Sequence, residues 1–171
     1  MATVQKNERR GLLIQIGKTE TLMPKHEMVA GETFKTGDRI PVYVLEVKNT
    51  TKGLQILVSR THPGLIKRLF EREVPEIGDG TVEIKSVSRE AGSRSKIAVY
   101  SDDPKIDPVG ACVGQKGARI AAVLESLGDE KIDIIKYSPN ITEFITESLS
   151  PAKVLSVEIN EEDRYVIIEP G

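Results

Sequence analysis

The feature that most constrains this chain is a pair of glycines, Gly114 and Gly117, set between two short helical patterns. Glycine has no side chain, so this segment can turn sharply and another molecule can approach its main chain closely. A helix that begins directly after such a turn presents free N–H groups and a partial positive charge, which attract phosphate. Gln115 and Lys116 add an amide and a cation. The chain is therefore expected to fold with two helices meeting at an exposed turn suited to a sugar-phosphate backbone.

The residues around this turn have clear helix and strand patterns. Asp107 and Pro108 predict the start of a short helix that runs to Val113, with Asp as the cap and Pro in the first turn. Apolar residues spaced along one helical face predict a second helix over 118–127. Residues 131–137 alternate between apolar and polar and predict a strand.

The first 62 residues predict an all-β module. A charged turn is expected at residues 7–10, and the expected strands cover residues 11–16, 21–24, 39–47 and 54–60. Residues 48–53 are expected to form a hairpin loop. Short strands with turn signals every 8–12 residues are typical of a small barrel.

A different pattern begins at Pro63. A helix is expected up to Val74, with Pro75 and Gly78 stopping it, followed by strands over 82–87 and 96–100 joined by a loop over 89–95. Near the end of the chain the order helix, strand, strand returns, over residues 141–149, 154–159 and 164–168. This second copy stops halfway, which is typical of a chain cut from a longer protein.

Charge is unevenly distributed along the chain. The net charge is −2, but residues 1–62 hold ten Lys and Arg against six Asp and Glu, and residues 147–171 hold two against six. This balance argues against strong nonspecific binding of duplex DNA, which needs many phosphate contacts. Apolar runs are too short to cross a bilayer and residues 1–10 form no secretory signal. We therefore expect a protein that does not bind membranes. The single cysteine excludes an internal disulfide and suits a reducing compartment, so we expect the protein to be cytoplasmic.

The order of elements from residue 63 onward resembles that of a type II KH domain, and the preceding barrel resembles the RNA-binding OB fold of ribosomal protein S-one. Longer runs resemble the NusA family of bacterial transcription elongation factors. These runs are Ile-Gly-Lys-Thr-Glu (16–20), Ser-Arg-Thr-His-Pro-Gly-Leu (59–65), Val-Pro-Glu-Ile-Gly-Asp-Gly (74–80), Val-Glu-Ile-Lys-Ser-Val (82–87), Arg-Glu-Ala-Gly (89–92), Asp-Pro-Val-Gly-Ala-Cys-Val-Gly (107–114) and Leu-Ser-Pro-Ala-Lys-Val (149–154).

This resemblance implies a multidomain chain: an all-β OB barrel over 1–62, an α+β type II KH domain over 63–138, and a truncated start of a second KH domain over 139–171. It also implies a role in which contacts with nascent RNA modulate pausing, termination and antitermination by RNA polymerase. The partners it implies are single-stranded RNA and, through the full-length protein, RNA polymerase and other transcription factors. We expect a monomer with no enzymatic activity, no cofactor and no metal site.

The candidate RNA-binding residues fall into two groups. Around the glycine turn they are Val113, Gly114, Gln115, Lys116, Gly117, Arg119 and Ile120, and on the barrel they are Arg9, Arg10 and Lys52. Lys116 and Arg119 are expected to contact phosphates, Gln115 sugar or phosphate, and the two apolar residues the bases. The barrel has further basic residues, including Arg39 and Arg60, but only Phe34 and Tyr43 as stacking aromatics, so its contribution is expected to be electrostatic and weak.

The same residues allow other interpretations. The glycine turn lacks the spacing and the Ser or Thr of a Walker loop. Cys112 is expected to pack in the core, His26 to lie on a surface loop, and His62 at the domain junction. A protein-interaction scaffold is the alternative function, suggested by the acidic residues 147–171, and an accessory region of a ribonuclease is a third. In such ribonucleases the KH domain precedes the OB domain, the reverse of the order here.

Overall fold

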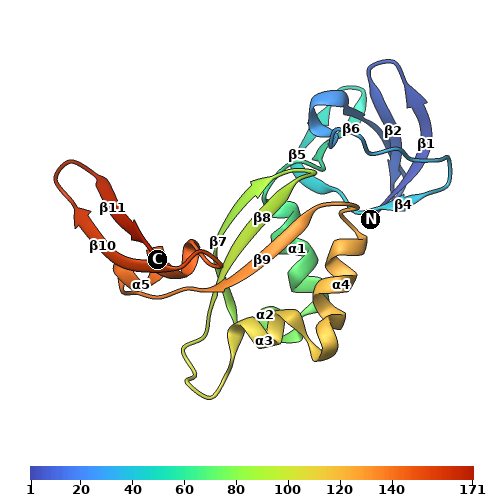
Figure 1. The fold of residues 1–171 in the computed structure, drawn as a ribbon. Helices are drawn as coiled ribbons and strands as arrows, with labels where there is room; N and C mark the ends of the chain where they lie inside the picture. The colour runs from blue at the N-terminus through green and yellow to red at the C-terminus, as the bar shows by residue number, and fades with distance from the viewer.

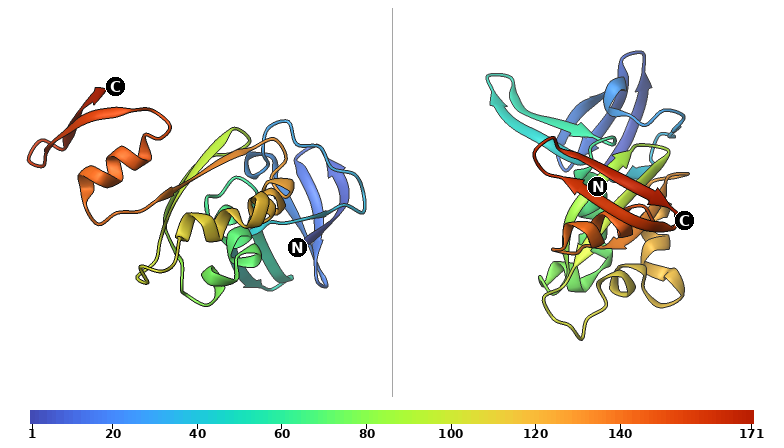
Figure 2. Two further views of the ribbon diagram at one scale, coloured as in Figure 1. Left: turned by 60° about the horizontal axis from the view of Figure 1, so that its bottom comes forward. Right: turned by 60° about the vertical axis from the view of Figure 1, so that its left-hand side comes forward.

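A computed structural model describes all 171 residues. It shows a β-barrel, a helix-and-sheet unit directly beside it, and a C-terminal arm that extends away from both (Figure 1). The left view of Figure 2 also shows the arm standing apart from the barrel.

The barrel is built from two sets of antiparallel strands around one core. The first set has the order β3-β2-β1-β4 and comprises β1 (Ala2–Glu8), β2 (Gly11–Ile16), β3 (Thr19–Pro24) and β4 (Arg39–Ile40), with the short 3-10 helix η1 (Lys25–Glu27) after β3. The second set is the hairpin of β5 (Tyr43–Thr50) and β6 (Gly53–Ser59). Strand β3 lies beside β6, where the Thr21 hydroxyl donates to the Ile56 carbonyl at 2.7 Å. The core comprises Ala2, Val4, Leu12, Ile14, Met23, Ile40, Ile56 and Val58.

Three features of the barrel differ from the expectation. The sequence predicted no strand before residue 11, yet β1 pairs with both β2 and β4 and buries Ala2 and Val4. Only these two small residues of β1 reach the core, so its pattern is too weak to recognise. The strand expected over 39–47 is interrupted at Pro41, which has no N–H for a sheet hydrogen bond. The hairpin loop is also shorter than expected, because β5 continues to Thr50.

The second unit packs helices on one face of a three-stranded sheet. Its elements are α1 (Gly64–Glu73), α2 (Pro75–Gly78), β7 (Glu83–Glu90), β8 (Arg94–Tyr100), α3 (Pro108–Val113), η2 (Gln115–Gly117), α4 (Ala118–Glu125) and β9 (Lys131–Lys136). The sheet order is β7-β8-β9, in which β8 is antiparallel to β7 and parallel to β9. A core cluster of 13 buried residues joins α1, α3 and α4 to the sheet. This is the predicted order of elements, although Pro75 begins α2 as well as ending α1, and the strands extend into the loop expected over 89–95.

The C-terminal arm consists of α5 (Ile141–Ser148) and the hairpin of β10 (Val154–Asn160) and β11 (Tyr165–Pro170). The predicted helix begins at a cap, where the Asn140 side chain accepts from the Glu143 N–H at 3.2 Å. Helix α5 contacts the sheet through Phe144, whose ring lies 5.0 Å from that of Tyr137. Strands β10 and β11 pair with each other alone and expose apolar side chains, including Leu155 and Ile167.

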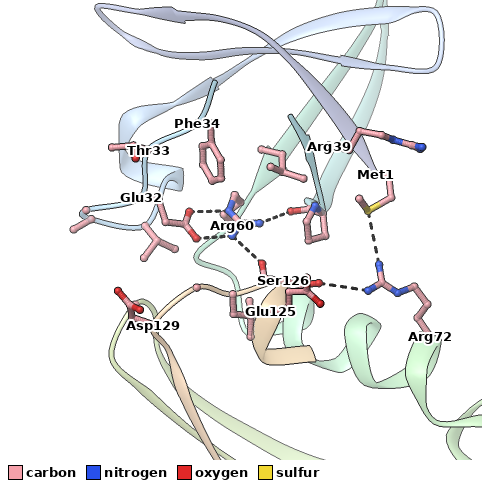
Figure 3. A pocket seen from close by; sticks show the side chains of 18 residues that line it. Met1, Glu32, Thr33, Phe34, Arg39, Arg60, Arg72, Glu125, Ser126 and Asp129 are labelled. Atoms are coloured by element: carbon pink, nitrogen blue, oxygen red, sulfur yellow. Dashed lines mark hydrogen bonds and ion pairs between the residues drawn. The ribbon is translucent and has the colours of Figure 1, made fainter. Parts of the chain in front are cut away.

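A buried arginine joins the barrel to the second unit (Figure 3). Arg60 is 2% exposed, and its Nε donates to the Glu32 carboxylate at 2.8 Å. Its Nη1 donates to the Pro41 carbonyl at 2.7 Å, and its Nη2 to the Ser126 carbonyl, just after α4, at 3.1 Å. The guanidinium also lies 5.3 Å from the centre of the Phe34 ring. One side chain therefore bonds to both units, at the edge of a hollow of about 570 Å³.

A second buried ion pair holds the linker between the units. The side chains of Arg89 and Glu130 are fully buried against each other, and Arg89 Nη1 donates to the His62 carbonyl at 2.9 Å. The His62 ring stacks on Tyr43 of the barrel, with centroids 4.4 Å apart. His62 is thus confirmed as a junction residue, which Arg89 of the second unit and Tyr43 of the barrel hold from either side.

We expect Arg60→Met to lower the free energy of unfolding by about 3 kcal/mol, because it leaves the Glu32 carboxylate buried without its partner. Arg68→Met is the matched control, since Arg68 forms an exposed pair with Glu71 and its loss is expected to cost no more than about 1 kcal/mol. Urea unfolding measures both. Equal costs for the two variants would contradict a stabilising junction.

Candidate nucleic-acid interface

The helix that leads into the glycine turn is capped as predicted. Asp107 Oδ1 accepts from the Gly110 N–H at 3.0 Å, and Pro108 occupies the first helical position. At the other end of α3 the Gly114 N–H still donates to the Gly110 carbonyl, at 2.9 Å. The chain then leaves the helix, so Gly114 is the point at which the turn begins.

The turn itself has a left-handed backbone at three of its four residues. The φ angles are +77° at Gly114, +52° at Lys116 and +75° at Gly117. Glycine adopts this conformation freely, but for Lys116 it costs on the order of 1 kcal/mol. Gln115 and Lys116 are both exposed. Such local strain in an exposed turn is a frequent property of binding sites.

The two glycines are needed for different reasons. A Cβ added to Gly114 would lie 2.6 Å from Cγ of Arg119, which packs against the turn. A Cβ on Gly117 would come no nearer than 3.9 Å to any atom outside its neighbours, so Gly117 is required for its backbone angle alone.

The guanidinium of Arg119 forms hydrogen bonds within the protein. Its Nη1 donates to Glu76 of α2 at 2.8 Å and to the Ala111 carbonyl of α3 at 2.7 Å. Arg119 therefore ties α2, α3 and α4 together next to the turn, a role that the sequence did not predict. Glu76 lies 43 residues away in the chain, and nothing in its surroundings marks it as a partner.

An apolar strip connects the turn to the edge of the sheet. Val113 and Ile120 are half-buried on either side of the turn. Ile120 and Ile134 of β9 pack against the same core cluster, and α3 packs on β9. Since β9 is an edge strand, one side of its main chain is free of sheet partners. Helices, turn and β9 thus surround an apolar floor with polar main chain beside it.

The predicted barrel residues do not join this site. Arg9 and Arg10 lie on the β1–β2 turn and Lys52 on the β5–β6 turn, all exposed. Figure 1 places the barrel at the opposite end of the second unit from α2 and α3. The expectation that Arg60 adds to a basic surface is wrong, because its guanidinium is buried at the junction.

The remaining candidate residues carry no reactive chemistry. Cys112 is buried in the core as predicted, and burial raises the pKa of its thiol to about 12, so it stays protonated at neutral pH. The structure contains no group of three or more His, Cys, Asp or Glu side chains arranged to hold a metal ion. None of its helices is long and apolar enough to span a bilayer.

Two family models match consecutive parts of the chain. An S1 RNA binding domain matches residues 1–59, and a NusA-like first KH domain matches residues 60–137. These matches identify the barrel as an S1-type OB fold and the second unit as a KH domain.

Curated relatives match over most of the chain. "Transcription termination/antitermination protein NusA" of Bacillus subtilis (strain 168) is 56% identical over 165 residues, which are 96% of this chain and 44% of the relative. The proteins of the same name from Halalkalibacterium halodurans and Thermus thermophilus are 52% and 46% identical, over 94% and 91% of this chain and 42% and 40% of the relatives. The chain thus spans less than half the length of these relatives.

We expect Gly114→Ala to destabilise the protein more than Gly117→Ala does. Gly117→Ala adds only left-handed strain, about 1–2 kcal/mol, whereas Gly114→Ala adds a clash with Arg119 as well. Adding Arg119→Ala to Gly114→Ala should reduce that extra cost relative to Arg119→Ala alone, because the contacts with Cγ and Cδ are lost while the Cβ of residue 119 stays 2.9 Å away. Urea unfolding of the four variants measures these differences, and the reverse order of the two glycine variants would contradict the geometry.

Proposed function

The chain belongs to the NusA family, and we propose that it binds single-stranded nascent RNA at the turn over 114–117, as part of a longer protein that modulates pausing, termination and antitermination by RNA polymerase. The observation that carries this proposal is the exposed left-handed turn between α3 and α4, with Lys116 on it. The names of the relatives support the transcriptional role.

The geometry supports a division of roles in the turn. Gly114 and Gly117 let a phosphate come close to the main chain at the N-terminus of α4, which no side chain caps. The Lys116 ammonium contacts a phosphate, and Gln115 a sugar or phosphate. Val113 and Ile120 support the bases, and free main-chain groups of β9 contact the base edges. A KH site of this kind holds about four nucleotides.

Arg119 has a different role in this proposal. Its hydrogen bonds to Glu76 and Ala111 position the turn, so it acts on RNA through the shape of the turn and not through a phosphate contact.

The rest of the chain is assigned around this site. We divide it into an OB barrel over 1–62, the KH domain over 63–138 and the start of a second KH domain over 139–171. The barrel adds a weak electrostatic contact through Arg9, Arg10 and Lys52. The full-length protein acts in the cytoplasm without catalysis, and contacts RNA polymerase and other transcription factors through parts outside this chain.

Salt dependence separates these roles. We expect Lys116→Gln to weaken binding of a short single-stranded RNA and to reduce the slope of log K against log salt by about 0.7, the value for one lost phosphate contact. Arg119→Gln should weaken binding with the slope unchanged. Fluorescence anisotropy at several salt concentrations measures both, and Lys153→Gln, on the arm, is the control.

The proposal fails if charge reversal at the turn has no effect. A Gln115→Asp/Lys116→Asp variant that folds normally and binds RNA as tightly as the wild type would exclude this turn as the RNA site.

A further inference from the structure

A hollow of about 640 Å³ lies where β8 and β9 end, and α5 forms its other wall. The loop between β8 and α3 contributes Asp102, and the residues directly after β9 contribute Tyr137 and Ser138. None of the residues proposed to bind RNA at the glycine turn lines it, although Lys136, the last residue of β9, does. Its volume is within the range of pockets that hold small organic ligands.

Two aromatic side chains line this hollow, Tyr100 and Tyr137, and a third, Phe144, packs on one of them without lining it. Tyr100 and Tyr137 meet edge to face, with centroids 5.8 Å apart, and Phe144 of α5 packs on Tyr137. These are three of the seven aromatic residues in the chain, which has four Tyr and three Phe. The other aromatics predicted to stack on RNA are used internally, because Tyr43 stacks on His62 and Phe34 packs beside Arg60. Both tyrosines of the hollow remain partly exposed, as required of a surface on which a base stacks.

The polar groups around the hollow are mainly acceptors. The carboxylates of Asp102, Glu143 and Glu147 line it, and Glu143 already accepts from the Ser138 hydroxyl at 2.7 Å. Glu147 makes no hydrogen bond through its side chain. Lys136 is the one cation that lines the hollow, against three carboxylates. Lys85 lies outside the lining, pairs with Glu83 at 2.9 Å and has its Nζ 5.3 Å and 5.7 Å from the two tyrosine ring centres. The excess of carboxylates disfavours a phosphate here but suits the amino group of a base, which donates.

We propose that this hollow is a second RNA site, which takes one unpaired base that carries an exocyclic amino group. The base stacks on Tyr100 or Tyr137, and Asp102 or Glu147 accepts from its amino group. The inference rests on the proposed function, because the turn over 114–117 delivers the strand. Tyr100 and Asp102 at the hollow precede α3 in the chain, the turn directly follows α3, and β9 packs on α3 and ends at the hollow, so we place the path of the strand from the turn to the hollow along β9.

The site predicts a length effect and a base preference. Uracil has no exocyclic amino group, and its one Watson–Crick donor, N3–H, lies between two carbonyl oxygens that a carboxylate repels, so it suits this site less well than cytosine. An RNA that extends beyond the four nucleotides of the turn should therefore gain affinity when the extension is cytosine and gain less when it is uracil. Stacking and this hydrogen bond together are expected to make the RNA with the cytosine extension bind on the order of 10-fold more tightly than the tetranucleotide alone.

The test uses the whole chain and a set of RNAs with one fixed tetranucleotide, alone or extended at either end by four cytosines or four uracils. Anisotropy titration gives each affinity. We expect the cytosine extension to bind about 10-fold more tightly than the tetranucleotide, and Tyr137→Leu and Tyr100→Leu to remove this gain while leaving the tetranucleotide affinity unchanged. Tyr165→Leu, on β11 outside the hollow, should keep it. Asp102→Asn, which preserves shape, should reduce the preference for cytosine over uracil.

The outcomes separate this inference from the proposed function. If tetranucleotide binding depends on Lys116 but the extension adds nothing, or adds the same in Tyr137→Leu, Tyr100→Leu and wild type, the hollow is not an RNA site and the function at the turn stands. If no RNA binds in a way that depends on Lys116, both proposals fail. Urea midpoints establish that each variant is folded, and Asp102→Asn tests the hollow even if a tyrosine variant does not fold.

Discussion

The arrangement of this molecule depends on two guanidinium groups that are buried with their carboxylates. Burying a charge is costly unless every donor and acceptor finds a partner. Arg60 and Arg89 meet this condition, because their groups bond to carboxylates and to main-chain carbonyls on both sides of the junction, and no buried side-chain polar atom in the structure lacks a partner. Another orientation of the barrel relative to the KH domain would leave these buried charges without partners, so the two pairs favour the orientation seen here. These bonds therefore fix the orientation of the barrel relative to the KH domain.

At the glycine turn, too, a single arginine makes the contacts that hold several elements together. Arg119 holds three helices together, and Gly114 leaves room for its side chain. The helices are thus fastened behind the turn while Gln115 and Lys116 stay exposed at its tip. A rigid support with a small exposed contact is what a backbone clamp needs, because little conformational entropy is lost when RNA binds.

Local signals in the sequence predicted the parts of this site that are local in the chain. The cap at Asp107, the glycine turn and strand β9 each follow from a few neighbouring residues, and the structure contains all three. The partners of Arg60 and Arg119 escaped prediction because they lie tens of residues away and a lone Glu carries no mark of its partner. The tyrosines of the hollow were missed for the same reason, since each is only the end of a strand until the fold brings them together.

The C-terminal arm is expected to have a lower local stability than the barrel and the KH domain. Barrel and KH domain each enclose a core, whereas β10 and β11 form a two-stranded ribbon whose outer faces meet solvent. A ribbon of two strands is marginal on its own, so its amides open to solvent far more often than those of β7 to β9. Helix α5 connects this ribbon to the KH domain and forms one wall of the tyrosine hollow. A ligand bound in the hollow would therefore hold α5 in place and slow hydrogen exchange in β10 and β11, which the ligand does not contact.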